Sequence, residues 1–194
     1  MKINQKQLLC FLFFTCFIAC EDDKPLDVYG LDASLIPLST LSSASMAVYS
    51  DNKGNLKEFT IDLKEEIVKK KVDGEDYAVE EIHVDLNNPS ETYHLTIQAS
   101  AEKIGDIITE SVIARLFTRA SFIEIPTIII NEQGQAIDCD KLGSLTLYNK
   151  TFQGVYRNSE NENIAYKYIY YNTELGIIGF TDEEGLLWVL ENYK

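Results

Sequence analysis

The fold class is decided by residues 77–100, in which Tyr-Ala-Val-Glu-Glu-Ile-His-Val-Asp-Leu (77–86) is followed by Asn-Asn-Pro-Ser (87–90) and then by Thr-Tyr-His-Leu-Thr-Ile-Gln-Ala-Ser (92–100). Apolar and polar residues alternate in the segments before and after residues 87–90, which is the pattern of a half-buried strand. Asn, Pro and Ser favour turns. The stretch therefore predicts an antiparallel hairpin with one apolar face and one polar face.

Outside this hairpin, short β-prone segments separated by turn residues continue from about residue 45 to the end of the chain. The candidate strands are residues 46–50, 56–63, 67–72, 77–86, 92–100, 111–118, 123–130, 145–148, 152–156, 165–172, 176–180 and 186–190. Turn-forming residues occupy 51–55, 73–75, 131–134 and 182–185. We expect a mainly β fold, an antiparallel β-meander that forms a sandwich or a curved half-barrel sheet.

One segment interrupts the β pattern. Ser100 is a residue type that caps helices, and it precedes apolar residues that recur at helical spacing. Those apolar residues are Ile104, Ile107, Ile108 and Val112. The spacing predicts one short helix near residues 101–110.

The N-terminus has the composition of a signal peptide. Lys2 and Lys6 precede an apolar run of about ten residues, too short for the ~20 that span a membrane. The run ends in Phe-Ile-Ala-Cys at 17–20, which resembles the lipobox of bacterial lipoproteins. The resemblance implies cleavage after residue 19 by the lipoprotein-processing machinery and a lipid anchor on Cys20. An ordinary secretory peptide with a chance cysteine is the alternative.

Two further segments resemble bacterial lipoproteins. The acidic run Glu21, Asp22 and Asp23 resembles the export signal of surface lipoproteins in the Bacteroidota, and the final 25 or so residues are similar to the ends of small Flavobacteria lipoproteins. The first resemblance implies a place at the outer membrane, on the cell surface; a solvated linker is the alternative. We expect a signal at 1–19, a lipidated cysteine and tether at 20–40, and a single β-rich domain at 41–194.

The charge of the mature chain restricts its partners. Removing residues 1–19 takes Lys2 and Lys6 from the 17 basic residues and none of the 31 acidic ones, which leaves 15 basic residues and a charge of −16. A nucleic-acid-binding protein would show a basic stripe instead. The densest basic cluster, Lys69–Lys71, is better interpreted as an exposed strand edge protected by lysines.

The two histidines offer a candidate metal site. A symmetric turn centred between residues 88 and 89 would place His83 opposite His94, with Cβ atoms about 5 Å apart. Glu81 and Asp85 share their face, and imidazole with carboxylate is a ligand set that zinc accepts. A solvent-facing polar pair without metal is the alternative.

Three tyrosines form a candidate binding surface. Tyr166, Tyr168 and Tyr170 alternate along one predicted strand, so their rings line one side of it, while Ile169 and Tyr171 point to the other side. An exposed aromatic row can stack on a sugar ring or a partner chain. The rings could instead cover the sheet under another layer.

No residue is assigned a catalytic role, because the common enzyme motifs are absent from the sequence. Cys139 is flanked by two carboxylates that oppose thiolate formation, so we expect a small buried or semi-buried residue rather than a nucleophile. The leading hypothesis is a membrane-tethered binding or accessory module that contacts a glycan, a peptide or another envelope protein. The alternatives are a lipid or lipoprotein carrier with an apolar cavity and, third, a metal-dependent hydrolase using His83 and His94. No cofactor is expected beyond the covalent lipid on Cys20, unless zinc binds the histidines.

Overall fold

The structure is a computed structural model that describes residues 26–31, 35–72, 74–104, 107–118, 127–159 and 168–194. Within these ranges the elements are β1 (Val28–Tyr29), α2 (Leu38–Ser43), β2 (Met46–Ser50), β3 (Leu56–Val72), β4 (Glu75–Asn87), β5 (Tyr93–Ile104), β6 (Ile107–Thr118), β7 (Thr127–Asn131), β8 (Asp140–Leu147), β9 (Lys150–Arg157), β10 (Ile169–Asn172), β11 (Gly176–Thr181) and β12 (Leu187–Tyr193). The prediction of a mainly β fold is confirmed.

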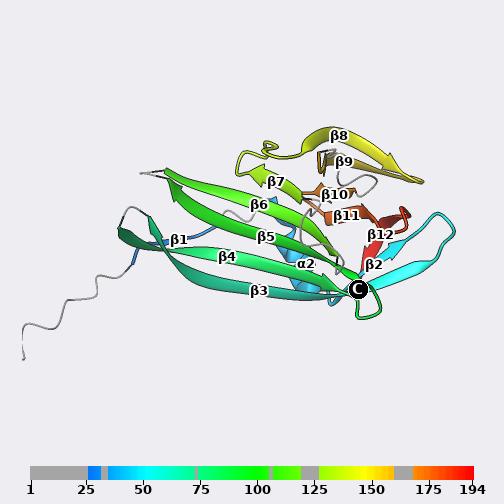
Figure 1. The fold of residues 1–194 in the computed structure, drawn as a ribbon, viewed down its shortest axis with the longest axis horizontal. Coiled ribbons are helices and arrows are strands. Elements are labelled where there is room, and N and C mark those ends of the chain that lie inside the picture. Colours follow the sequence, from blue (N-terminus) through cyan, green and yellow to red (C-terminus); the bar gives the residue numbers. More distant parts are fainter. Residues whose placement is uncertain (1–25, 32–34, 73, 105–106, 119–126, 160–167) are drawn as a thin grey trace, which may run out of the picture.

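The strands form one curled antiparallel sheet. Their order is β7-β6-β5-β4-β3-β2-β12-β11-β10-β9-β8, and β1 lies off this path, parallel to β4. The curl brings β10 against β6 and β7 and brings β11 against β5 (Figure 1). Of the two architectures expected from the sequence, the curved half-barrel is therefore the one that forms.

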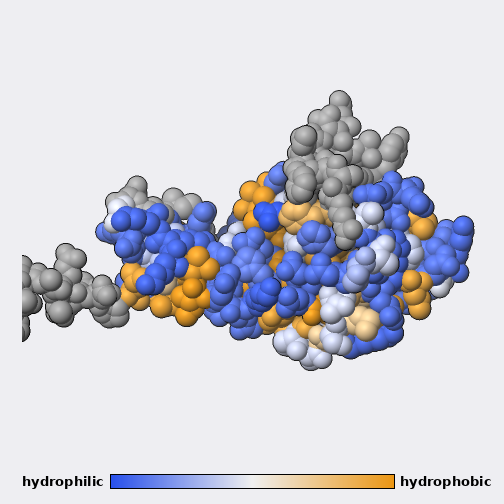
Figure 2. Space-filling model, turned by 60° about the horizontal axis from the view of Figure 1, so that its bottom comes forward, coloured by the Kyte–Doolittle hydropathy of each residue, from blue (hydrophilic) through white to orange (hydrophobic). Residues whose placement is uncertain are grey.

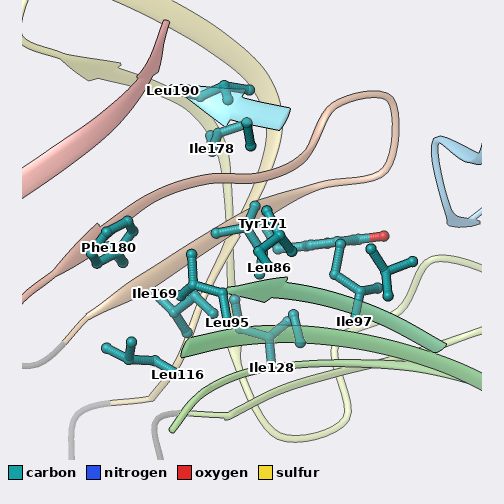
Figure 3. Close-up of a cluster of buried hydrophobic side chains, with 14 of the residues drawn as sticks. Leu86, Leu95, Ile97, Leu116, Ile128, Ile169, Tyr171, Ile178, Phe180 and Leu190 are labelled. Atoms are coloured by element: carbon teal, nitrogen blue, oxygen red, sulfur yellow. The ribbon is translucent and has the colours of Figure 1, made fainter. Parts of the chain in front are cut away.

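The concave side of the sheet is filled by aromatic and branched side chains. The Phe180 ring lies 5.2 Å from Tyr49, 5.8 Å from Phe59 and 5.5 Å from Tyr93, measured between centroids. Figure 3 shows residues of β4, β5 and β6 meeting those of β10 and β11 in this core. Tyr49 donates a hydrogen bond to the Ile177 carbonyl at 2.8 Å, so its buried hydroxyl is satisfied.

The sheet forks where β4 and β5 separate. Their pairing ends at Glu81 and Ser100, whereas β3 pairs with β4 as far as Val72–Glu75 and β5 pairs with β6 as far as Ile104–Ile107. We call the described residues of 66–81 and 100–111, together with β1, the arm, and the rest of the sheet the body. Figure 1 shows the two hairpins of the arm diverging at one end of the molecule.

A separate, small apolar cluster holds the arm together. Its buried members are Tyr77, Val79 and Ala101. Side chains alternate between the faces of a strand, so Tyr77 and Val79 lie on the opposite face of β4 from Ile82 and Val84, which belong to the main core. The arm is therefore not an extension of the body's core.

Three turns repeat one hydrogen-bonding scheme. Asp51, Asn131 and Asp182 each accept hydrogen bonds at their side-chain oxygen from the backbone N–H groups two and four residues later. The third residue after each is a glycine with φ between +67° and +83°, a region that glycine adopts readily. The turns predicted at 51–55, 131–134 and 182–185 are confirmed.

The helix predicted near residues 101–110 is wrong. This segment is the β5–β6 hairpin, in which Ala101 lies opposite Glu110 and Ile104 lies opposite Ile107. The β-branched residues of the segment favour extended backbone, and the partner strand supplies the hydrogen bonds that a helix would have supplied internally.

The region assigned to a tether is partly folded. Residues Val28–Tyr29 pair with β4, while Leu35, Ile36 and Leu41 are buried in the main core. The domain therefore begins before residue 41, and within the described chain it includes residues 26–31. The sequence pattern did not predict this folded segment, because its few apolar side chains lie among turn-forming residues and serines.

Candidate functional site

The predicted pairing of the two histidines is wrong. A turn centred between residues 88 and 89 would pair residues whose numbers sum to 177, but the numbers of β4 and β5 partners sum to 181. His83 therefore lies opposite Gln98, and His94 lies opposite Phe117 of β6. The cause is a longer connection, in which Asn88 accepts hydrogen bonds from the Ser90 N–H and hydroxyl groups. A shift of four preserves the face of every side chain, so the predicted apolar and polar faces are confirmed.

The polar face of β3–β7, opposite the core, carries side chains in cross-strand rows. We call it the outer face. One row comprises Asp62, Asp85, Thr96, Arg115 and Thr127. The next comprises Lys64, His83, Gln98, Ile113 and Ile129. Because strands lie ~4.8 Å apart, each row extends about 19 Å. The first row carries hydrogen-bonding groups along its whole length, whereas the second ends in Ile113 and Ile129.

A groove of about 260 Å³ lies on this face, lined by residues of β4, β5 and β6 that include both histidines. The His94 and Phe117 rings stack at its wall, with centroids 4.9 Å apart and planes within 6°. Thr96 and Gln98 add a hydroxyl and an amide. The groove therefore combines ring surfaces with polar groups of both hydrogen-bonding kinds.

Arg115 is a cationic group of this groove that, within the described residues, forms no ion pair with a carboxylate. Its guanidinium is half-buried, and burial lowers the pKa of this group. Its hydrogen bond within the described part of the chain goes to Gln98 Oε1 at 3.5 Å. A guanidinium has five N–H donors, so most of its donors remain free for a ligand in the groove.

A second cluster on the outer face joins three groups that could bind a metal. Ligand atoms of Glu66, Glu81 and His83 lie within 4.8 Å of one another. Burial raises the pKa of Glu81, but the Lys70 ammonium, 2.7 Å from its carboxylate, and His83 together bring it below its ordinary value of 4.5. Lys70 thus already neutralises the buried member of the cluster. Glu81 lies beside His83 as expected from the sequence, whereas His94 does not belong to this cluster.

The tyrosine row lies on β10 and the residue before it. The Tyr168 and Tyr170 rings are 6.2 Å apart, and the Arg157 guanidinium lies 5.2 Å from the Tyr168 ring. Ile169 and Tyr171 are fully buried on the other side, as predicted. Tyr166 lies outside the described residues.

A cleft of about 290 Å³ that the sequence did not reveal lies between the β2–β3 and β8–β9 turns. Lys150 forms an ion pair with Glu191 at 2.8 Å, and Ser50 donates a hydrogen bond to the same carboxylate. Tyr148, whose φ is +52°, donates a hydrogen bond to the Leu187 carbonyl at 2.6 Å. The charged and hydroxyl groups of this cleft therefore already have partners within the protein, which leaves fewer of them for a ligand. Turn residues gave the only sequence signal for this region.

Cys20, Glu21, Asp22 and Asp23 lie outside the described residues. Cys139 is half-buried as predicted; burial raises the pKa of its thiol, which contacts the Ile129 carbonyl at 3.4 Å.

Among the residues that the structure describes, no helix is long and apolar enough to span a membrane. Comparison with known proteins gives no match to a family model, to a curated protein or to a solved structure.

Proposed function

We propose that the chain is a lipid-anchored binding or accessory module of the bacterial cell envelope, which binds its ligand in the groove beside Arg115. The lipobox ending in Cys20 supports the anchor, and the acidic run that follows supports an outer-membrane location on the cell surface. The lipoprotein-processing and export machinery are the partners that such an anchor requires. A nucleic acid needs a basic stripe that neutralises many phosphates, which this sequence does not show, whereas a single guanidinium can pair with one carboxylate of a ligand.

The free donors of Arg115 are the observation that carries this proposal. A half-buried guanidinium has lost part of its hydration, which a ligand carboxylate would replace, and a guanidinium binds carboxylates with high geometric specificity. The stacked rings of His94 and Phe117 offer apolar surface of the kind that packs against the C–H face of a sugar. The ligand class that fits these groups is an acidic envelope glycan that carries uronic-acid carboxylates.

Binding of polygalacturonate to the purified mature chain tests the proposal, with dextran as the neutral polymer. We expect Arg115→Gln to weaken polygalacturonate binding by about tenfold or more, because a hydrogen bond to a charged group contributes ~1.5–3 kcal/mol. Titration calorimetry measures the affinity. Equal affinity for the two polymers would contradict the acidic-glycan assignment.

Arg157→Gln is the matched control, because Arg157 is the guanidinium beside the alternative aromatic surface at Tyr168 and Tyr170. It also pairs with Asp140 at 2.9 Å, so it has a carboxylate partner that Arg115 lacks. The proposal expects Arg157→Gln to retain binding. Loss in Arg157→Gln with retention in Arg115→Gln moves the site to the tyrosines.

The metal-dependent alternative now rests on Glu66, Glu81 and His83 rather than on a pair of histidines. Zinc titration of the mature chain tests it: the alternative requires micromolar binding that His83→Ala removes. The carrier alternative has less support, because side chains fill the concave side of the sheet. The apolar cavity beside Leu31, Leu35 and Ile36 has a volume of about 10 Å³, which is room for one water molecule and not for a lipid chain.

A further inference from the structure

The first described residues of the chain are fixed to the arm. The Asp27 carbonyl accepts a hydrogen bond from the Ala78 N–H at 3.1 Å, and Val28 and Tyr29 pair with Ala78 and Val79. The Tyr29 ring packs edge-on against Tyr77 at 6.3 Å. Only residues 21–27 therefore separate Cys20 from β1, whereas the tether expected from the sequence ran to residue 40.

The direction of β1 shows from which side the chain arrives. β1 is parallel to β4, and β4 runs from Glu75 at the arm tip to Asn87 in the body. The chain therefore enters β1 from the tip side. Seven residues span at most about 25 Å when fully extended. β3, by contrast, has 17 residues and runs about 55 Å from the β2–β3 turn to the arm tip.

The arm also exposes apolar side chains that a bilayer would cover. Val28, Ile67 and Ile107 are 55%, 64% and 66% exposed. Figure 2 shows apolar surface at the arm end of the molecule. Two lysines near the arm tip are paired with carboxylates, since Lys71 lies 3.7 Å from Asp76 and Lys103 lies 3.2 Å from Glu75. Apolar contact, rather than attraction to anionic lipid, is the interaction this surface offers.

We propose that the arm docks on the lipid surface that carries the Cys20 anchor, with the face of β1 and β3 that presents Val28 and Ile67 at the headgroup boundary. This inference rests on the lipid anchor of the proposed function. The body then stands away from the membrane. Figure 1 shows the β2–β3 turn at the end of the molecule opposite the arm. In this orientation the turn and the cleft beside it lie farthest from the bilayer.

Depth-dependent quenching on the lipidated mature chain tests the docking. A fluorophore is attached at Ile67→Cys or, as the matched control, at Leu56→Cys, with Cys139→Ser in both chains. Leu56 is 61% exposed and lies on the same strand, so the two positions differ mainly in their place along β3. In vesicles of phosphatidylethanolamine with headgroup-nitroxide lipid, we expect strong quenching at residue 67 and little at residue 56. Equal quenching overturns the docking.

Two further measurements separate the docking from the anchor and from the short tether. Flotation with vesicles reports the anchor: a chain that fails to float, or a Cys20→Ser chain that floats equally well, contradicts the lipoprotein assignment and the docking with it. A flexible Gly/Ser insertion after Asp23 lengthens the tether. Docking predicts that residue 67 stays quenched in this longer chain, whereas loss of quenching shows that the tether alone held the arm near the lipid and overturns the docking.

Discussion

The body and the arm are built from the same four long strands but are stabilised in different ways. In the body, β3–β6 pack against β10–β12 around Tyr49, Phe59 and Phe180, all fully buried. In the arm, the same strands have only the cluster around Tyr77 and Val79, together with ion pairs along the strand edges. Continuous strand pairing therefore does not imply uniform stability, which depends on the apolar area buried at each point along the strands.

Removing a ring from the body should have the largest effect. Phe180→Ala deletes the ring that touches three other aromatic rings, and a buried Phe→Ala substitution costs about 3–5 kcal/mol. We expect the whole domain to unfold at lower denaturant, as measured by circular dichroism. Leu56→Ala, at an exposed position, should change the unfolding free energy by less than about 0.5 kcal/mol. Local unfolding in Phe180→Ala, without a shift of the global transition, would contradict this view of the body.

The second effect concerns a lysine in the body. The Lys57 ammonium lies 2.9 Å from Glu91, 3.5 Å from Asp182 and 4.3 Å from the centre of the Trp188 ring. Lys57→Met leaves two partly buried carboxylates without their cation, which we expect to cost about 2 kcal/mol of unfolding free energy.

Lys64→Met is the matched control, because Lys64 pairs with Asp62 on the exposed surface and its loss should change the unfolding free energy much less than the loss of Lys57. Denaturant titration of both variants checks the difference. An equal loss in the two would show that the site around Lys57 is as solvated as the surface.

A smaller and local effect is expected in the arm. Val79→Ala removes two buried methyl groups from the small cluster, which should cost about 1–2 kcal/mol. Hydrogen exchange should accelerate at arm amides such as those of Tyr77 and Ala101 and stay unchanged at body amides such as that of Val84. Uniform acceleration along β4 would mean that the arm and the body open as one cooperative unit.

The smallest effect is a pH dependence confined to the arm. Because the pKa of Glu81 is lower in the folded chain than its ordinary value of 4.5, its contribution to stability is complete above that pH and is lost as pH falls through the folded pKa. The Val79 methyl resonances should therefore shift below pH 4.5 in the wild type but not in Glu81→Gln. Body methyls, such as those of Val84, serve as the reference. A shift that persists in Glu81→Gln would assign the titration to another group.

Local patterns predicted the fold class, most strands and three turns, because alternation and the Asp/Asn-x-x-Gly turns act within a few residues. The register of β4 and β5 was not predictable in this way. A change of four residues keeps every side chain on its face, so hydrophobic pattern cannot distinguish the two registers, and the Asn88 hydrogen bonds decide between them.

The candidate site was less predictable than the fold. His83, Glu81 and the facing of Tyr168 and Tyr170 followed from alternation, but Arg115 had no local signal. Its position beside Thr96 and Gln98 arises from the pairing of β5 with β6, and the expected helix near residues 101–110 concealed that pairing. A site whose side chains come from different strands can be recognised only when the pairing register of those strands is known.

The pairing of β2 with β12 has a consequence for the timing of folding. These strands are neighbours in the sheet, yet Ser50 and its partner Val189 are separated by most of the chain. The hairpins can form early from contacts close in sequence, but the body closes only after the last residues are available. Since β12 lies between β2 and β11, the two parts of the sheet, β2–β7 and β8–β11, join only when β12 pairs with β2, so the core around Phe180 forms after the local hairpins.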